Sequence, residues 1–275
     1  MRVRGFFKPR LSILGERYSP LEWYRNHRAD AFVLSFPKTG RTWLRLMMHR
    51  ALSLHLGVTP TDPLEFHDFT AADPRVPRIR VIHDDEPHWR HPHTLHESKE
   101  RYRGKRVILL VRDPRDAIVS LWFQNTKRWK VFDKSLHEFL WQSRGSLRSM
   151  VRFYNIWAAN RHVPRELLLV RYEGMHADPV GTLRNAMALI GVDDVPDRVL
   201  VDAIEENRID ALRQREASLR YGTKRLRPGD LGDPESFKAR KGKVGGYAEY
   251  LSPEDIRAAN ELINRELDPW YGYEV

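Results

Sequence analysis

A lysine, a glycine and two threonines stand close together in the segment 35–43, which reads Ser-Phe-Pro-Lys-Thr-Gly-Arg-Thr-Trp. A turn between a strand and a helix directs several backbone N–H groups and the positive helix end at one place, where an anion can bind. Lys38 adds a positive charge there, and Thr39 and Thr42 add hydroxyl donors. A nucleoside-triphosphatase P-loop needs Gly-x-x-x-x-Gly-Lys-Ser/Thr, whereas here the lysine precedes the glycine. An ordinary turn with an exposed lysine is the alternative.

A second candidate anion site is Arg112, which follows the continuous apolar run 107–111. Open α/β sheets bind ligands at the carboxyl ends of their strands. An Asp-Pro pair directly after Arg112 predicts the start of a helix, and Ser120 lies about two turns into it. A guanidinium beside a hydroxyl would suit a phosphate monoester. The alternative is a capped helix in which Arg112 pairs with Asp113 or Asp116.

A third basic segment, 237–246, reads Phe-Lys-Ala-Arg-Lys-Gly-Lys-Val-Gly-Gly. Charged runs are usually solvated, but a cationic loop with glycines could also fold over a bound polyanion. This segment belongs to a longer stretch, residues 217–246, that shows little periodicity. A stretch of that length in a compact domain is either a functional lid or disordered.

The elements that must hold these segments alternate between buried strands and amphipathic helices, which predicts an α/β fold with a central parallel sheet flanked by helices. We expect strands at 31–36, 80–83, 107–111 and 167–172, and helices at 43–56, 114–124, 179–190 and 253–267. The first strand, the turn at 37–40 and the first helix form a P-loop-like phosphate-binding unit. We predict one domain over residues 1–275, with a core of about 28–270 and an N-terminal extension at 1–27.

The composition limits the classes of protein that the chain can belong to. Its 275 residues are 41% hydrophobic and 31% charged, which excludes a disordered protein. Lys and Arg number 47 against 37 Asp and Glu, and a net charge of +10 favours an anionic partner. No apolar run reaches the roughly 18 residues of a membrane span, and we expect no secretory signal. The absence of cysteine excludes disulfides and fits a cytoplasmic location, which we predict.

Together, the three segments resemble the motifs of the sulfotransferases that use 3′-phosphoadenosine 5′-phosphosulfate (PAPS). Their first motif is similar to Tyr-Pro-Lys-Ser-Gly-Thr-Thr-Trp and matches 36–43. Their second, Arg-Asn/Asp-Pro-Lys/Arg-Asp-x-x-x-Ser, matches 112–120, and their third, Arg-Lys-Gly-x-x-Gly, matches 240–245. The matches occur in family order. The resemblance covers about residues 28–270.

The resemblance implies a set of donor-binding residues. The 5′-phosphosulfate would lie on the first loop, at Lys38, Thr39, Gly40, Arg41 and Thr42. The 3′-phosphate would be held by Arg112 and Ser120, with Arg240, Lys241 and Gly242 closing over it. Trp43 and Tyr172, the latter at the end of its strand, would lie near the adenine. Lys38 would also stabilise charge on the bridging oxygen while the bond to sulfur breaks.

The resemblance also implies a catalytic base, His83, at the end of the strand before the second motif. A histidine pKa near neutrality suits that role, although the nearby His88 is an alternative. In the competing interpretation, His83 is a strand-end histidine paired with Asp84 or Asp85. We expect no metal, because the cluster 91–96 contains a proline and no carboxylates at ligand spacing.

The resulting hypothesis is an enzyme that moves a sulfuryl group from PAPS to the hydroxyl of a small-molecule, lipid or carbohydrate acceptor, releasing adenosine 3′,5′-bisphosphate (PAP). A P-loop-like nucleotide kinase and a basic nucleic-acid-binding protein are the alternatives, although we expect no nucleic-acid partner. The chain departs from the family at 81–83, which lacks the lysine of Lys-Thr-His, and at 246–247, where Gly-Tyr replaces Asp-Trp. The family's dimer motif is unmatched, so the oligomeric state stays open.

Overall fold

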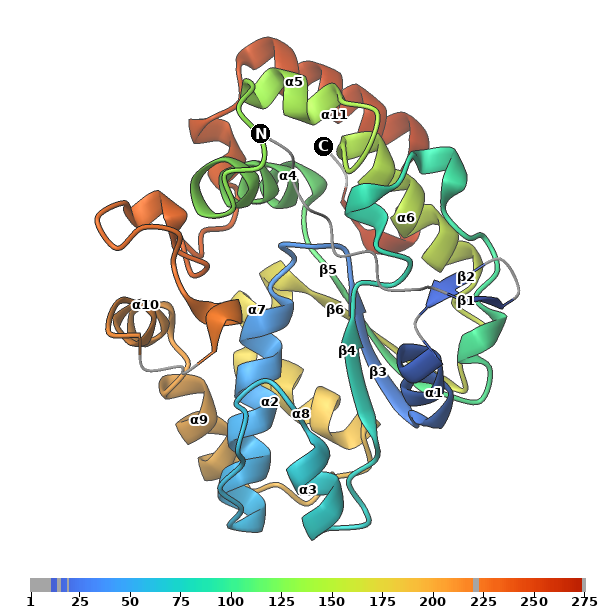
Figure 1. Cartoon of the computed structure of the whole chain (residues 1–275), viewed down its shortest axis with the longest axis vertical. Helices are drawn as coiled ribbons and strands as arrows, with labels where there is room; N and C mark the ends of the chain where they lie inside the picture. Colours follow the sequence, from blue (N-terminus) through green and yellow to red (C-terminus); the bar gives the residue numbers. More distant parts are fainter. Residues whose placement is uncertain (1–10, 14–15, 19, 220–222, 274–275) are drawn as a thin grey trace.

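Four parallel strands form the central sheet in the order β4-β3-β5-β6. The computed structural model describes the chain except residues 1–10, 14–15, 19, 220–222 and 274–275. The strands are β3 (Ala31–Ser35), β4 (Ile79–Ile82), β5 (Arg106–Val111) and β6 (Glu166–Arg171). Each overlaps a strand predicted from the sequence. A separate antiparallel pair, β1 (Leu11–Ile13) and β2 (Glu16–Tyr18), lies with α1 (Pro20–Arg28) near one end of β3 and β4 (Figure 1).

Helices cover both faces of this sheet (Figure 1). One face packs against α2 (Arg41–Leu56), α8 (Pro179–Leu189) and α9 (Asp197–Glu205), and the other against α4 (Pro114–Phe123), α6 (Leu147–Ala159) and α11 (Pro253–Glu266). Along β3, Ala31 and Val33 face the first set of helices, whereas Phe32 and Leu34 face the second. Burial on both faces explains why the strands are continuously apolar rather than alternating. The predicted α/β architecture is confirmed.

The local signals define the helix ends well. The side chain of Asp113 accepts a hydrogen bond from the N–H of Arg115, and Pro114 begins α4, as the Asp-Pro pair predicts. Gly57 ends α2 in the left-handed conformation, with φ of 65°. After α4 the chain continues in a π-helical turn, Gln124–Arg128. Three strands end one residue earlier than predicted: β3 at Ser35, β4 at Ile82 and β6 at Arg171. Tyr172 is therefore not the last strand residue but the first residue of α7 (Tyr172–Ala177).

The remaining elements are short. They are α3 (His67–Ala72), α5 (Leu136–Trp141), α10 (Ile209–Ala217) and 3₁₀ turns at Pro87–Trp89, Pro92–Thr94, Glu100–Tyr102, Lys224–Leu226, Pro234–Ser236, Gly246–Glu249 and Pro269–Tyr271. The described part of 217–246 is therefore irregular, as the sequence indicates. Part of it, including 238–243, lines the cavity described next, which favours the lid interpretation.

Candidate active site

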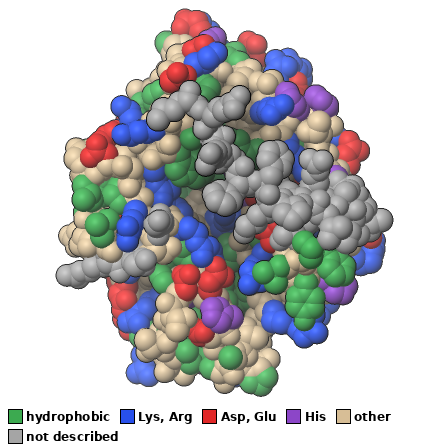
Figure 2. Space-filling view, viewed as in Figure 1, with side chains coloured by type: hydrophobic (Ala, Val, Ile, Leu, Met, Phe, Trp, Pro, Cys, Tyr) green, Lys and Arg blue, Asp and Glu red, His purple; other side chains and the backbone are tan. Residues whose placement is uncertain are grey.

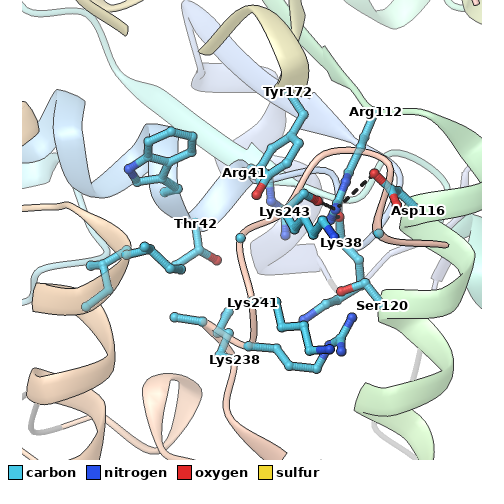
Figure 3. A pocket seen from close by; sticks show the side chains of 18 of the residues that line it. Lys38, Arg41, Thr42, Arg112, Asp116, Ser120, Tyr172, Lys238, Lys241 and Lys243 are labelled. Atoms are coloured by element: carbon cyan, nitrogen blue, oxygen red, sulfur yellow. Dashed lines mark hydrogen bonds and ion pairs between the residues drawn. The ribbon is translucent and has the colours of Figure 1, made fainter. Parts of the chain in front are cut away.

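The carboxyl ends of the four strands meet at one edge of the sheet, and each delivers a predicted site residue. His83 follows β4 directly, Arg112 follows β5 and Tyr172 follows β6, whereas Lys38 lies three residues beyond β3. A cavity of about 950 Å³ opens at this edge. It is lined by every predicted site residue except Thr39: Lys38, Gly40, Arg41, Thr42, Trp43, His83, Arg112, Ser120, Tyr172, Arg240, Lys241 and Gly242 (Figure 3). The side chain of Thr39 is buried and donates to the carbonyl of Phe36 at 3.1 Å.

The first loop has the geometry of an anion cradle. Helix α2 begins at Arg41, and its N-cap, Gly40, has no side chain that could cap the helix. The N–H of Trp43 donates to the carbonyl of Gly40 at 2.8 Å, and the N–H groups of Arg41 and Thr42 stand at the helix start, where an anion could bind. Gly40 has φ of 95°, and a Cβ at this position would lie 2.5 Å from Cδ2 of Tyr172. The backbone conformation and the close approach of the tyrosine ring therefore both require glycine.

The cations of this loop are half-buried and lie close to other cations. Burial, together with Arg128 and Arg112, lowers the pKa of Lys38 to about 7. Burial, with Arg45 nearby, lowers the pKa of Arg41 to about 9. Cations are destabilised in this way when a site withholds water and offers little negative charge. An anionic ligand would supply the missing charge.

The Arg112 guanidinium lies at the centre of the site. It stacks 4.1 Å from the ring centre of Tyr172 and donates to the carbonyl of Lys243 at 2.8 Å. The expectation of a pair with Asp113 was wrong, because that carboxylate binds Arg115. The pair with Asp116 does form, at 3.4 Å, while Arg112 also lines the cavity. Arg112 can therefore pair with Asp116 on the capped helix and also contribute to an anion site in the cavity.

Asp116 is a residue whose role the sequence reasoning missed. Its two carboxylate oxygens accept the backbone N–H groups of Gly245 and Tyr247, each at 2.8 Å. This pair of hydrogen bonds ties the third motif to α4, although the two are far apart in the sequence. Asp116 lies four residues after Arg112, within the second motif. The motif therefore already contained the residue that holds the third motif.

The cations of the third motif reach the cavity but already have partners. Arg240 donates to Glu235 and to the hydroxyl of Tyr250, each at 2.8 Å. Lys241 pairs with Glu249 at 2.9 Å. Gly242 has φ of 64° and lies against Ile209, with no room for a Cβ. These residues form the wall of the cavity contributed by the segment after α10 (Figure 3).

Three aromatic side chains gather at another part of the cavity. The ring of Trp43 lies 6.0 Å from Tyr172 and 4.8 Å from His176, and the last two rings are 4.7 Å apart. His176 was not singled out from the sequence; it lies one helical turn after Tyr172 on α7. The rings are inclined to one another, and each offers an apolar face against which a nucleobase could pack.

His83 has the orientation of a neutral imidazole. Its Nδ1 donates to the carbonyl of Ser35 at 3.0 Å, and its Nε2 accepts from the Arg41 guanidinium at 2.7 Å, since arginine can only donate. Burial, together with Arg41 and His88, holds the pKa of His83 well below its usual value. The interpretation in which Asp84 or Asp85 pairs with His83 was wrong, because these carboxylates bind Lys99 and Arg90 instead.

The second candidate base, His88, lies next to the first. The two imidazole rings are 5.4 Å apart in an edge-to-face arrangement. Burial, with Arg41 nearby, lowers the pKa of His88 to about 4.

Among the described residues, no group of three or more potential metal ligands comes together. In the same part of the chain, no helix is both long and apolar enough to span a bilayer.

The sequence matches the sulfotransferase domain family over residues 28–270. The chain belongs to the sulfotransferase family. The predicted enzyme class, a PAPS-dependent sulfotransferase of the cytosolic type, is thereby confirmed. Cytosolic sulfotransferase 17 of Arabidopsis thaliana is 25% identical over 272 residues, with 90% of this chain and 76% of the relative covered. Flavonol 3-sulfotransferase of Flaveria bidentis is 24% identical and covers 89% of this chain and 83% of its own length.

Two solved structures with bound PAP have a similar fold. A mouse sulfotransferase complexed with PAP superimposes with a TM-score of 0.61 at 20% identity, covering 87% of this chain and 84% of its own. Retinol dehydratase in a complex with retinol and PAP gives a TM-score of 0.60 at 18% identity, covering 87% and 81%. At these identities the structures establish the fold of this sulfotransferase.

Proposed function

We propose that this sulfotransferase binds PAPS across the carboxyl edge of its sheet and moves the sulfuryl group to the hydroxyl of an acceptor. The observation that carries the proposal is the cavity itself, which is lined by the half-buried cations Lys38 and Arg41, whose pKa values are lowered to about 7 and 9. The phosphosulfate would lie on the first loop. Arg112 and Ser120 would hold the 3′-phosphate, and the rings of Trp43 and Tyr172 would face the adenine.

In this arrangement His83 accepts the proton of the acceptor hydroxyl at Nε2. The acceptor oxygen forms a bond to sulfur while the bond between sulfur and the bridging phosphate oxygen breaks, and Lys38 stabilises the charge that appears on that oxygen. Arg41 occupies Nε2 of His83 in the structure, at 2.7 Å. Arg41 must therefore release the imidazole before transfer, and an anion on the first loop would draw the guanidinium away.

The alternatives are less well supported. The family match runs over residues 28–270, and the first loop lacks the glycine pattern of a kinase P-loop. A nucleic-acid-binding protein usually concentrates its charge in one stripe. Figure 2 instead shows lysine and arginine scattered over the visible face with acidic side chains between them.

Ligand-induced stabilisation tests the donor assignment. PAP should raise the melting temperature of the protein strongly, and ATP should raise it much less. Replacing Arg112 by Ala should weaken PAP binding by about 2–3 kcal/mol, because a charged hydrogen-bonding partner is lost. Ser120→Ala, which disturbs the fold less, should weaken it by about 1 kcal/mol. The control is Arg184→Ala, which removes an ion pair with Asp197 outside the cavity.

If PAP and ATP stabilise the protein equally, or if both cavity variants bind PAP like the parent, the donor assignment is wrong.

The proposal also includes a cytoplasmic location, which is supported by the names of the cytosolic plant relatives. We further propose that residues 1–27 form an extension outside a core of about 28–270.

A further inference from the structure

One part of the cavity lies next to the proposed base rather than next to the donor-binding motifs. A chain of aromatic rings runs outward from His83: His88 is 5.4 Å away, Trp89 lies 4.9 Å from His88, and Trp129 lies 6.5 Å from Trp89. The two tryptophans are nearly parallel, at 19°, and are 51% and 42% exposed. Of these rings, those of His83, His88 and Trp129 line the cavity, and Trp89 stacks beside Trp129 at the surface. We therefore expect an acceptor to enter along this row.

Two cations that belong to no predicted motif role line the same cavity. Arg128 ends the π-helical turn after α4 and is held by the carbonyls of Arg227 and Arg225, at 3.0 and 2.8 Å. Lys238 lies just before the third motif, and its Nζ donates to the carbonyl of Arg225 at 3.3 Å. Both side chains are thus anchored from one loop, around residue 225.

These two cations lie close enough to the first loop for their positive charges and that of Lys38 to repel one another. Burial, followed by Arg128 and Lys38, holds the pKa of Lys238 well below its usual value. Burial likewise lowers the pKa of Arg128. Figure 3 shows Lys238 on the wall of the cavity opposite Arg112. The cavity therefore holds more buried positive charge than the first loop alone provides.

The nearby carboxylates compensate only part of this charge. Glu216 is buried close to Lys38, Arg128 and Lys238, but its two oxygens accept the backbone N–H groups of Lys238 and Ala239, at 2.6 and 3.1 Å. Glu86 offsets the charge of Arg41. In the proposed complex, the phosphosulfate would neutralise Lys38 and Arg41. Arg128 and Lys238, which are half-buried on the cavity wall, would then still need a counter-charge, since cations withdrawn from water are costly unless they are paired.

We propose that the acceptor carries its own anionic group, which pairs with Arg128 and Lys238 while its apolar body lies along Trp89 and Trp129. This inference rests on the proposed sulfuryl transfer and narrows it to hydroxylated acids. An acid of this kind would place its hydroxyl at His83 and its charge on the opposite wall of the cavity.

Matched pairs of acceptors test the inference. A panel of phenols, such as 3-(4-hydroxyphenyl)propionate, is compared with the corresponding primary amides, which have nearly the same shape and no charge. Transfer is followed as PAP release, and binding to the PAP-loaded protein is followed by quenching of tryptophan fluorescence. The acids should be preferred over their amides by roughly 10–100-fold in kcat/KM and in affinity, because a charge-assisted hydrogen bond is lost with the amide.

The variants assign that preference to the two cations. Lys238→Met and Arg128→Met should each reduce the ratio of acid to amide to near one. The control, Lys127→Met, removes an exposed neighbouring charge outside the cavity and should leave the ratio and the activity unchanged.

The inference is overturned if no acid in the panel is preferred in transfer or in binding, although PAP still stabilises the protein. It is also overturned if Lys238→Met lowers the rates with acid and amide equally and raises the KM for PAPS, because the lysine would then serve the donor. Failure of PAP to bind the parent would instead refute the proposed function itself.

Discussion

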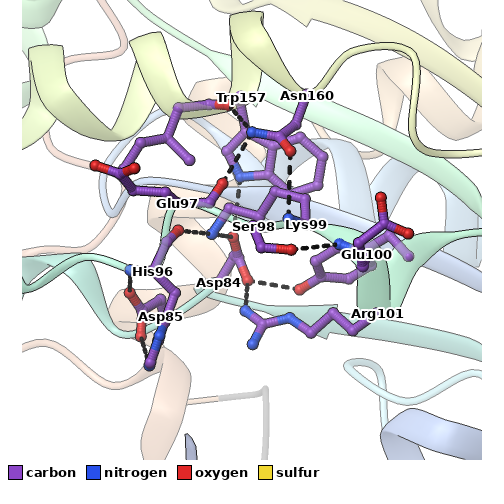
Figure 4. Close-up of polar contacts among 12 residues, drawn as sticks. Asp84, Asp85, His96, Glu97, Ser98, Lys99, Glu100, Arg101, Trp157 and Asn160 are labelled. Atoms are coloured by element: carbon purple, nitrogen blue, oxygen red, sulfur yellow. Dashed lines mark hydrogen bonds and ion pairs between the residues drawn. The ribbon is translucent and has the colours of Figure 1, made fainter. Parts of the chain in front are cut away.

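Two charged clusters lie near His83, one buried and one half-buried, and they are built in opposite ways. On one side, the carboxylate of Asp84 is completely buried and receives four donors: Lys99 at 3.0 Å, Trp157 at 3.0 Å, Tyr102 at 2.6 Å and Arg101 (Figure 4). On the other side, Lys38, Arg41, Arg128 and Lys238 surround a cavity. In the first cluster the protein itself supplies the counter-charge, whereas in the second, under the proposed function, the anionic donor and acceptor would supply it.

The difference separates structural charge from functional charge. A buried carboxylate that is fully hydrogen-bonded and paired fixes the backbone around it. Buried cations without enough counter-charge cost stability, and a protein keeps them where a ligand will supply that charge. Depressed pKa values are therefore informative in the cavity, where burial is the largest cause for Lys38, Arg41 and Lys238.

The Asp84 cluster also supports the loop that carries the candidate bases. Directly after it, Asp85 and Glu86 have φ of 63° and 49°, in the left-handed region that non-glycine residues avoid. Asp85 is held by the N–H of His96 at 2.7 Å and by Arg90 at 3.0 Å. This strained turn leads to His88, which lines the cavity. The buried carboxylate of Asp84 therefore helps to fix the backbone that positions His88.

The largest effect on folding is expected at Asp84. Replacement by Ala leaves the buried Lys99 without its carboxylate, which should lower the free energy of unfolding by about 3–5 kcal/mol. Urea denaturation measures this change. The matched control is Glu97→Ala, which breaks an exposed pair with Arg152 and should cost less than about 1 kcal/mol. Equal effects of the two substitutions would mean that the Asp84 cluster is not a structural anchor.

The next effect concerns turnover. His83→Asn should lower kcat by roughly 10²–10⁴-fold, while PAP binding stays nearly unchanged, because the base contacts the acceptor rather than the nucleotide. Activity of the parent should be lost as pH falls through the pKa of His83, since an imidazolium cannot accept a proton. Because burial lowers that pKa, the loss should occur below pH 6.5. If His88→Asn abolishes activity and His83→Asn does not, the base is His88.

The contrast between the clusters also explains what the sequence could predict. The residues of the first loop lie next to one another in the chain, and so do those of the second motif. Their types and order therefore predicted two anion sites. Asp116, Glu216 and Lys238 acquire partners through tertiary packing, and single-sequence patterns contain little of that information. The direction of Asp84 was misjudged for a related reason: successive residues at a strand end point to different sides, so proximity in sequence to His83 did not mean contact.

The helices that were not predicted show the same limit. Helix α6 packs its apolar side onto the sheet and buries Trp157, but no motif drew attention to it. The described part of the segment 217–246 is irregular, as its sequence indicates. Its path along the cavity wall, however, follows from contacts with Glu216 and Asp116, which lie outside the segment.

The smallest expected effect on stability is at Lys38, and its sign is the informative part. If the positive charge of Lys38 lacks a partner in the ligand-free protein, removing that charge should stabilise the fold. Lys38→Met should raise the unfolding free energy of the ligand-free protein by about 1–2 kcal/mol at pH 7, because it removes a cation disfavoured by burial. Between pH 7 and 10.5, unfolding takes up a proton at this lysine, so the parent gains stability as pH rises and the advantage of the variant disappears. The variant should also lose turnover, since the interaction of Lys38 grows in the transition state. Urea denaturation across this pH range, beside kcat, measures both. A variant that is less stable than the parent at pH 7 would show that the protein already neutralises Lys38, and the contrast with Asp84 would then be wrong.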